Sequence, residues 1–222
     1  MGSGRLITFE GPDGSGKTTQ LELLKTFLTE KGFSVLFTRE PGGTRIGEKL
    51  RQIILDKEHQ EMDAVTEVFL YAAARAQHVS ELIKPAMAAG KLVVCDRFVD
   101  SSIAYQAWGR SLGNMVAEIN RWAAAGLMPD LTFLLMVAPE AGRTRLEQGR
   151  TEELDRLERE PAEYRQRVCE GYRTLAEQAP ERIVFLDGTR SIESLQKEIR
   201  ERTLRLLEED SPGKEGPWEA GR

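Results

Sequence analysis

One short stretch near the amino end limits what this chain can fold into. "FEGPDGSGKTTQ", residues 9–20, has the spacing G-x4-G-K-T, directly after the apolar run "LITFE" and at the start of the helical pattern "TTQLELLKTFL". A glycine-rich turn between a strand and a helix lets backbone amides converge on a phosphate group, and the helix start adds partial positive charge. The sequence therefore predicts a phosphate-binding loop (P-loop) at one edge of a sheet.

Two side chains of this loop are suited to ATP. Lys17 is expected to bridge the β- and γ-phosphates, and the hydroxyl of Thr18 is expected to ligate Mg²⁺. Asp13 is not required by the donor nucleotide, because a carboxylate is a poor neighbour for a triphosphate. The predicted ATP site consists of Gly11, Pro12, Asp13, Gly14, Ser15, Gly16, Lys17, Thr18 and Thr19.

Five apolar runs alternate with helical patterns along the chain. They lack a polar alternate face, which is typical of strands covered on both sides in a parallel sheet. We therefore predict an α/β fold with a five-stranded, doubly wound parallel sheet and helices on both faces. The five runs are "RLITFEG", "SVLFTRE", "KLVVCDRF", "LTFLLMVA" and "RIVFLDG".

The length of 222 residues suits one domain, which we place at residues 1–208. Residues 64–90 read as one long helix with Pro85 near its end, whereas residues 209–222 combine Pro, Gly and charge and are predicted to be a flexible tail.

Composition excludes several classes of protein. The net charge of -5 argues against a nucleic-acid groove. The longest plain apolar run, at residues 131–138, is too short to span a membrane, and the first residues do not resemble a signal peptide, so we expect a cytoplasmic protein with no membrane partner. Cys95 and Cys169 have neither metal-ligand nor redox spacing and are predicted to be reduced thiols.

Two further segments should face the P-loop. "TREPGGT" follows the second predicted strand and "CDRFVDSSIAYQ" follows the third. In a parallel sheet both emerge at the edge where ligands bind. Asp96 is placed to hold Mg²⁺ through water, and Arg97 can grip two oxygens of an acceptor phosphate, although a surface salt bridge is the plainer alternative for Arg97. The guanine motif N-K-x-D is absent, which disfavours a GTPase.

Five strings in this order resemble the thymidylate kinase family. The resemblance covers Leu6 to about Leu207. It implies a P-loop nucleoside monophosphate kinase fold with a small lid, phosphorylation of dTMP to dTDP by ATP in dTTP biosynthesis, and a homodimer. The strings are "FEGPDGSGKTT", "REPGGT", "YAAARAQH", "DRFVDSSIAYQ" and "LMPDLTFLL".

The resemblance also implies a set of dTMP-binding residues. Tyr71 would stack on thymine, a position more often occupied by Phe in the family, while Arg75 would donate to a thymine carbonyl. Asp13 would lie near the 3′-hydroxyl, for which a carboxylate is a good acceptor. Arg51 is equally explained by an ordinary amphipathic helix. The predicted set is Asp13, Glu40, Arg51, Tyr71, Arg75, Arg97, Ser102, Tyr105 and Gln106.

The predicted lid, at about residues 143–160, is rich in arginine. Some relatives carry an arginine inside the P-loop, but this chain has Ser15 there, so the catalytic arginine is expected in the lid. Arg150 and Arg156 are the candidates, with Arg145 behind them; a solvated helix laced with Glu and Arg explains the same charges. The predicted catalytic residues are Lys17, Asp96, Arg97, Arg150 and Arg156.

Two other functions stay open at this point. A deoxynucleoside kinase would use Glu40 as a general base toward a neutral 5′-hydroxyl. A nucleotide-binding module without turnover would bind ATP and form no product. His59 and His78 have no evident partner in the sequence and are expected to be surface or helix-packing residues.

Overall fold

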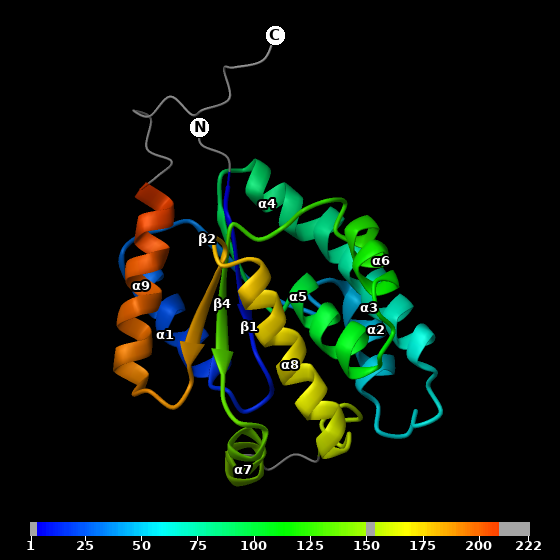
Figure 1. Ribbon diagram of the computed structural model, residues 1–222. Coiled ribbons are helices and arrows are strands. Elements are labelled where there is room, and N and C mark those ends of the chain that lie inside the picture. Colours follow the sequence, from blue (N-terminus) through cyan, green and yellow to red (C-terminus); the bar gives the residue numbers. More distant parts are fainter. Residues whose placement is uncertain (1–3, 150–153, 209–222) are drawn as a thin grey trace.

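Five parallel strands form one sheet in the order β2-β3-β1-β4-β5 (Figure 1). The computed structural model describes residues 4–149 and 154–208. Every residue of the central strands β1 and β4 is buried, whereas β2 and β5, at the two edges, are partly exposed. The predicted sheet is thus confirmed, but the expectation that all five strands are fully covered is wrong for the edges. The strands are β1 (Leu6–Glu10), β2 (Val35–Arg39), β3 (Leu92–Asp96), β4 (Leu131–Met136) and β5 (Ile183–Asp187).

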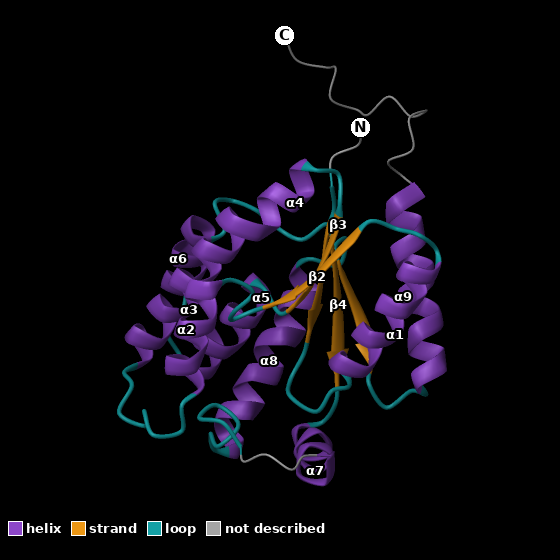
Figure 2. Ribbon diagram, turned by 180° about the vertical axis from the view of Figure 1, so that it is seen from behind, coloured by secondary structure: helices purple, strands orange, loops and turns teal. Residues whose placement is uncertain are grey.

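Helices cover both faces of the sheet, as predicted. α1 and α9 lie on one face, and α8 lies on the other (Figures 1 and 2). The helices are α1 (Lys17–Glu30), α2 (Arg45–Leu55), α3 (Ala64–His78), α4 (Lys84–Ala88), α5 (Val99–Ser102), α6 (Met115–Ala123), α7 (Pro139–Gly149), α8 (Ala162–Gln178) and α9 (Ile192–Glu208).

Successive side chains of β1 point to opposite faces of the sheet and all are buried, so helices must cover both faces. Ile7 and Phe9 pack with Leu24 and Leu28 of α1, all four fully buried. Burying each such side chain stabilises the fold by about 1.5–3 kcal/mol. Residues 6, 8 and 10 point the other way because strand side chains alternate.

The long helix predicted at residues 64–90 is one helical run with a π-helical segment, Val79–Ile83, between α3 and α4. A second π-helical segment, Ile103–Gly109, continues α5. The predicted lid overlaps α7 and the segment after it, and its residues 150–153 lie outside the described residues, as does the predicted tail. None of the helices in the described ranges is both long and apolar enough to cross a membrane.

The P-loop leaves β1 in a turn that requires glycine. Gly11 has φ 134°, and a Cβ there would lie 2.0 Å from the carbonyl oxygen of Leu135. Gly14 has φ 76°, and its Cβ would lie 2.2 Å from the carbonyl oxygen of Gly142 in α7. Any other residue would clash with backbone at both positions. The loop is therefore packed tightly between β4 and α7.

Candidate active site

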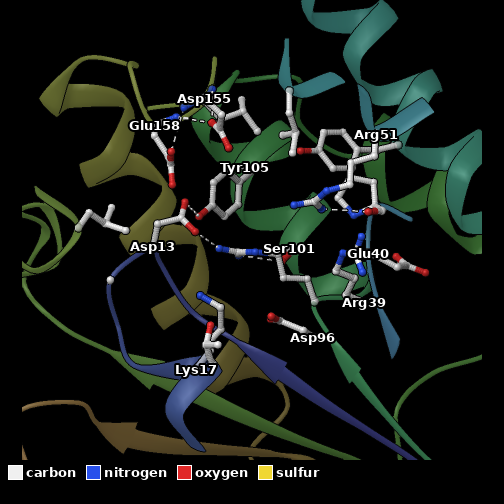
Figure 3. A pocket seen from close by; sticks show the side chains of 18 of the residues that line it. Asp13, Lys17, Arg39, Glu40, Arg51, Asp96, Ser101, Tyr105, Asp155 and Glu158 are labelled. Carbon is white, nitrogen blue, oxygen red and sulfur yellow. Dashed lines mark hydrogen bonds and ion pairs between the residues drawn. The ribbon is translucent and has the colours of Figure 1, made fainter. Parts of the chain in front are cut away.

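A cavity of about 560 Å³ opens at the carboxyl ends of the strands, which is a size typical of ligand sites (Figure 3). Strand register creates it: Phe9 pairs with Asp96, and Asp96 with Arg39, so β1, β2 and β3 end side by side. Most of the predicted site residues meet here. Those that line the cavity are Asp13, Gly14, Gly16, Lys17, Thr18, Thr19, Glu40, Arg51, Tyr71, Asp96, Arg97, Ser102, Tyr105 and Gln106.

Lys17 lines the cavity at the first residue of α1. Its ammonium group donates to the carbonyl oxygens of Gly11 at 2.9 Å and Pro12 at 3.0 Å. Burial, followed by the charge of Arg97, lowers the pKa of Lys17 to about 8, although Asp13 and other carboxylates oppose the shift. A bound polyphosphate would favour the charged form, so nucleotide binding and protonation of Lys17 are coupled.

This coupling gives a pH prediction. The affinity of the protein for ATP is expected to fall about 5- to 10-fold between pH 7.5 and pH 9, because an increasing share of Lys17 must gain a proton upon binding. Calorimetric titration at several pH values measures this. Lys17→Met should bind ATP more weakly but with a flat profile over the same range; an equal pH dependence in both proteins would contradict the assignment.

Asp96 offers an oxygen without a partner. Its Oδ1 atom is buried and accepts no hydrogen bond, yet the side chain lines the cavity together with Lys17 and Thr18. A carboxylate oxygen and a hydroxyl are the hard ligands that Mg²⁺ prefers, and Mg²⁺ in kinases takes its remaining ligands from phosphates and water. The residues present therefore fit this ion.

Arg97 is held in place by several acceptors. Its backbone is left-handed, with φ 68°, and its Nη1 atom donates to the carbonyl oxygen of Gly11 at 3.0 Å. Its Nη2 atom donates to Asp13, whose other carboxylate oxygen accepts from the hydroxyl of Tyr105 at 3.1 Å. Burial would raise the pKa of Asp13, but Arg97 and Lys17 lower it below its usual value, so the carboxylate stays charged. Asp13 is thus turned toward Arg97 and Tyr105.

Glu40 lines the cavity but has both carboxylate oxygens engaged. One accepts from Nε of Arg75 at 2.7 Å and the other from Nδ1 of His78 at 2.9 Å. His78 is fully buried and also contacts Thr38 through Nε2 at 2.7 Å, so the expectation that it has no evident partner is wrong. Arg75 is buried behind the cavity wall and does not line the cavity, because its guanidinium contacts Glu40, Ser102, Asn120 and the carbonyl oxygen of Phe98.

The predicted lid arginines lie in different places. Arg150 is outside the described residues. Arg156 is buried, with Nη2 2.8 Å from Glu67 and Nε donating to the carbonyl oxygen of Ile54, and it does not line the cavity. Glu67 is fully buried and also pairs with Arg110 at 2.9 Å. Arg145, in contrast, lines the cavity, and its guanidinium donates to the carbonyl oxygen of Gly188.

Several residues that line the cavity are not in the predicted sets, and the polar ones among them are Arg39, Ser101, Asp155 and Glu158. Ser101 lines the cavity next to Ser102, which is in the predicted dTMP-binding set. Asp155 and Glu158 lie in the predicted lid and line the cavity opposite Lys17 and Asp96 (Figure 3). Both carboxylates fall in a charge-rich stretch with many Glu and Arg residues, in which no sequence pattern distinguishes a single acid.

Known proteins are similar in sequence to nearly the whole chain. The family model described as thymidylate kinase matches residues 9–199. A thymidylate kinase from Exiguobacterium sibiricum is 51% identical over 207 residues, which covers 92% of this chain and 96% of the relative. The chain belongs to the thymidylate kinase family.

Other members agree with this placement. A thymidylate kinase from Symbiobacterium thermophilum is 48% identical over 208 residues, covering 93% of this chain and 94% of that relative. The crystal structure of thymidylate kinase from Ehrlichia chaffeensis superposes with a TM-score of 0.73 at 31% identity, covering 91% of this chain and 99% of that chain. As a member of the thymidylate kinase family, the protein is a phosphotransferase, and ATP is its co-substrate.

Proposed function

We propose that this protein phosphorylates dTMP to dTDP by holding both nucleotides in the one cavity and passing the γ-phosphoryl group of ATP directly between them. The observation that supports this most is the convergence of two cations. Lys17 Nζ and Arg97 Nη1 donate to the same carbonyl oxygen, that of Gly11, and are therefore within about 6 Å of each other. Two cations this close suit a phosphoryl group shared between a donor and an acceptor.

On the donor side, P-loop amides and Lys17 would hold the β- and γ-phosphates at the start of α1. Thr18 and Asp96 would hold Mg²⁺, which when bound neutralises charge on the transferring group. Arg145 already lines this cavity, whereas Arg156 would have to leave Glu67 before it could reach a phosphate. The turn that follows β5, residues 187–190, lies beside the P-loop. Gly188 in this turn is so close that an added Cβ would lie 3.0 Å from the carbonyl oxygen of Ser15.

On the acceptor side, Arg97 would bind the phosphate of dTMP, and Asp13 and Tyr105 would meet its deoxyribose. Ser102, Gln106, Arg51 and Tyr71 complete this part of the cavity. The acceptor phosphate is largely dianionic at neutral pH, so it attacks without a general base. Glu40 could not easily serve as one, because both its oxygens accept hydrogen bonds.

A substrate test uses the difference between the dianionic phosphate of dTMP and the neutral 5′-hydroxyl of thymidine. Incubation with Mg-ATP and either dTMP or thymidine should give ADP and dTDP from dTMP, and no product from thymidine, whose neutral hydroxyl would need a base. Product from thymidine alone would overturn the proposal. ATP binding without ADP formation on any nucleoside monophosphate would instead indicate a silent binding module.

Asp13→Ala is expected to raise the KM for dTMP by about tenfold and the KM for ATP by less than threefold, because the carboxylate contacts Arg97 and Tyr105 on the acceptor side. Steady-state kinetics with each substrate varied in turn measures both constants. A larger change in the KM for ATP would count against the proposed orientation of Asp13.

We also propose a cytoplasmic homodimer with no nucleic-acid or membrane partner. Large apolar side chains are exposed on neighbouring helices: Phe69 of α3 is 55% exposed and Trp122 of α6 is 72% exposed. Exposed apolar groups of this kind are typical of interfaces between protein subunits. Sedimentation at micromolar concentration should give twice the mass of one chain, and a monomer would contradict this part.

A further inference from the structure

Glu10 is a buried acid directly beneath the active site. It is the last residue of β1, one residue before the P-loop, and it is fully buried. Strand alternation turns its side chain toward the face that α8 covers, and the side chain does not line the cavity. A carboxyl group in such a place is costly unless it is hydrogen-bonded.

Three donors surround this carboxyl group. Oε1 accepts from the backbone nitrogen of Phe98 at 2.7 Å, in the residue that follows Arg97. Oε2 accepts from the hydroxyls of Ser101 and of Tyr172, the latter at 2.8 Å. Tyr172 comes from α8, far along the chain, and is itself fully buried.

The same two hydroxyls face Arg97. Nη1 of Arg97 donates to Ser101 Oγ at 3.2 Å and to Tyr172 Oη at 3.2 Å. The two hydroxyl oxygens also lie 2.9 Å from each other. Each hydroxyl has a single proton, and when Glu10 is charged its carboxylate attracts both protons in preference to the neighbouring hydroxyl oxygen. The lone pairs of Ser101 and Tyr172 are then left to accept from the guanidinium, so the acid decides which way both hydroxyls point.

The surroundings of Glu10 act on its pKa in opposite directions. Burial first, and then the charge of Asp100, raise the pKa of Glu10 to about 7, against the lowering effects of Ser101, Arg97 and the Phe98 nitrogen. Tyr172 on α8 also faces it. Arg97 therefore has two roles here. Its positive charge favours the ionised form of Glu10, and its guanidinium donates to the two hydroxyl oxygens that ionised Glu10 orients.

We propose that Glu10 and Tyr172 are positioning residues that hold the guanidinium of Arg97 in its orientation toward the acceptor phosphate. Neither touches a substrate; both act through the hydroxyl oxygens and the backbone beside Arg97. This inference rests on the proposed role of Arg97 in binding dTMP. It also gives α8, the helix that follows the lid, a direct connection to the acceptor arginine.

Glu10→Gln and Tyr172→Phe test it, because each keeps nearly the same volume while removing the orienting charge or the bridging hydroxyl. Each is expected to lower kcat/KM for dTMP by roughly tenfold, with the KM for ATP within twofold of the wild-type value. A merely structural role would lower the active fraction and leave both KM values unchanged. Thr203→Val is the control: it removes a fully buried hydroxyl of α9 that does not line the cavity, at nearly constant volume, and should change kcat/KM by less than twofold.

A double-mutant cycle separates the possible failures. If Tyr172 acts through Arg97, adding Tyr172→Phe to Arg97→Lys should lower kcat/KM by less than threefold further, whereas a full additional tenfold loss would contradict the proposal. A wild-type protein that makes no dTDP would instead contradict the proposed function. If Arg97→Lys were impaired while Glu10→Gln and Tyr172→Phe kept normal constants, the positioning inference alone would be wrong.

Discussion

Arg97→Ala is expected to lower kcat for dTMP phosphorylation by about 10²- to 10³-fold, as the loss of a preorganised charge-stabilising donor does. The guanidinium lies between Asp13 and the carbonyl oxygen of Gly11, next to Lys17, where the proposed mechanism requires charge on the transferred group to be neutralised. The KM for dTMP should rise as well, because the same group is proposed to bind the acceptor phosphate. Initial rates with ATP and dTMP varied separately measure both effects.

Two controls make this result specific. Arg97→Lys keeps the charge but cannot bind two oxygens in a planar fork, so it should recover only part of the loss. Arg202→Ala removes a half-exposed arginine of α9, far from the cavity, and should leave kcat within twofold. If Arg97→Ala kept kcat/KM for dTMP within fivefold of the wild type, Arg97 would not be the acceptor-phosphate ligand.

Glu67→Ala is expected to lower the free energy of unfolding by about 3–5 kcal/mol, because it leaves buried cations without their shared partner. Glu67 is fully buried and is paired with Arg110 at 2.9 Å and Arg156 at 2.8 Å. Arg110 would keep its ion pair with Glu160 at 2.6 Å. For a chain of this size the loss corresponds to a Tm roughly 10 °C lower. Thermal and urea unfolding followed by circular dichroism measure it.

Glu61→Ala is the matched control, because Glu61 is an exposed acid six residues earlier in the chain. Its unfolding free energy should stay within about 0.5 kcal/mol of the wild-type value. Equal stability of Glu67→Ala and Glu61→Ala would show that the Glu67 ion pairs contribute nothing net to the fold.

The fold could be predicted from sequence because its signals are local. The apolar runs of β1, β3 and β4 are long enough to be recognised one at a time, and glycines mark the turn that follows β1. Whether a strand lies at the edge of the sheet cannot be predicted from its own residues. The sequences of β2 and β5 are apolar runs like the others, and the sheet order shows that each lacks a neighbouring strand on one side.

Most of the predicted site residues line one cavity for a related reason, since parallel strands bring their carboxyl ends to one edge. The ion pairs behind the cavity wall were not predictable, because they join charged residues that are distant in sequence. Arg156 reads as a lid arginine until its contact with Glu67 is seen. His78 reads as a packing residue until Glu40 is found beside it. A sequence displays the charges but not their pairing.

The central claim is that one cavity holds dTMP and ATP at once, with Arg97 on the acceptor phosphate and Lys17 on the donor. A crystal structure of the protein with dTMP, Mg²⁺ and a non-hydrolysable ATP analogue tests it most directly. We predict the guanidinium of Arg97 within hydrogen-bond distance of the dTMP phosphate, and the ammonium of Lys17 within the same reach of the β- and γ-phosphates. A dTMP phosphate bound away from Arg97, with Arg97 still bonded only to Asp13 and its present partners, would contradict the account.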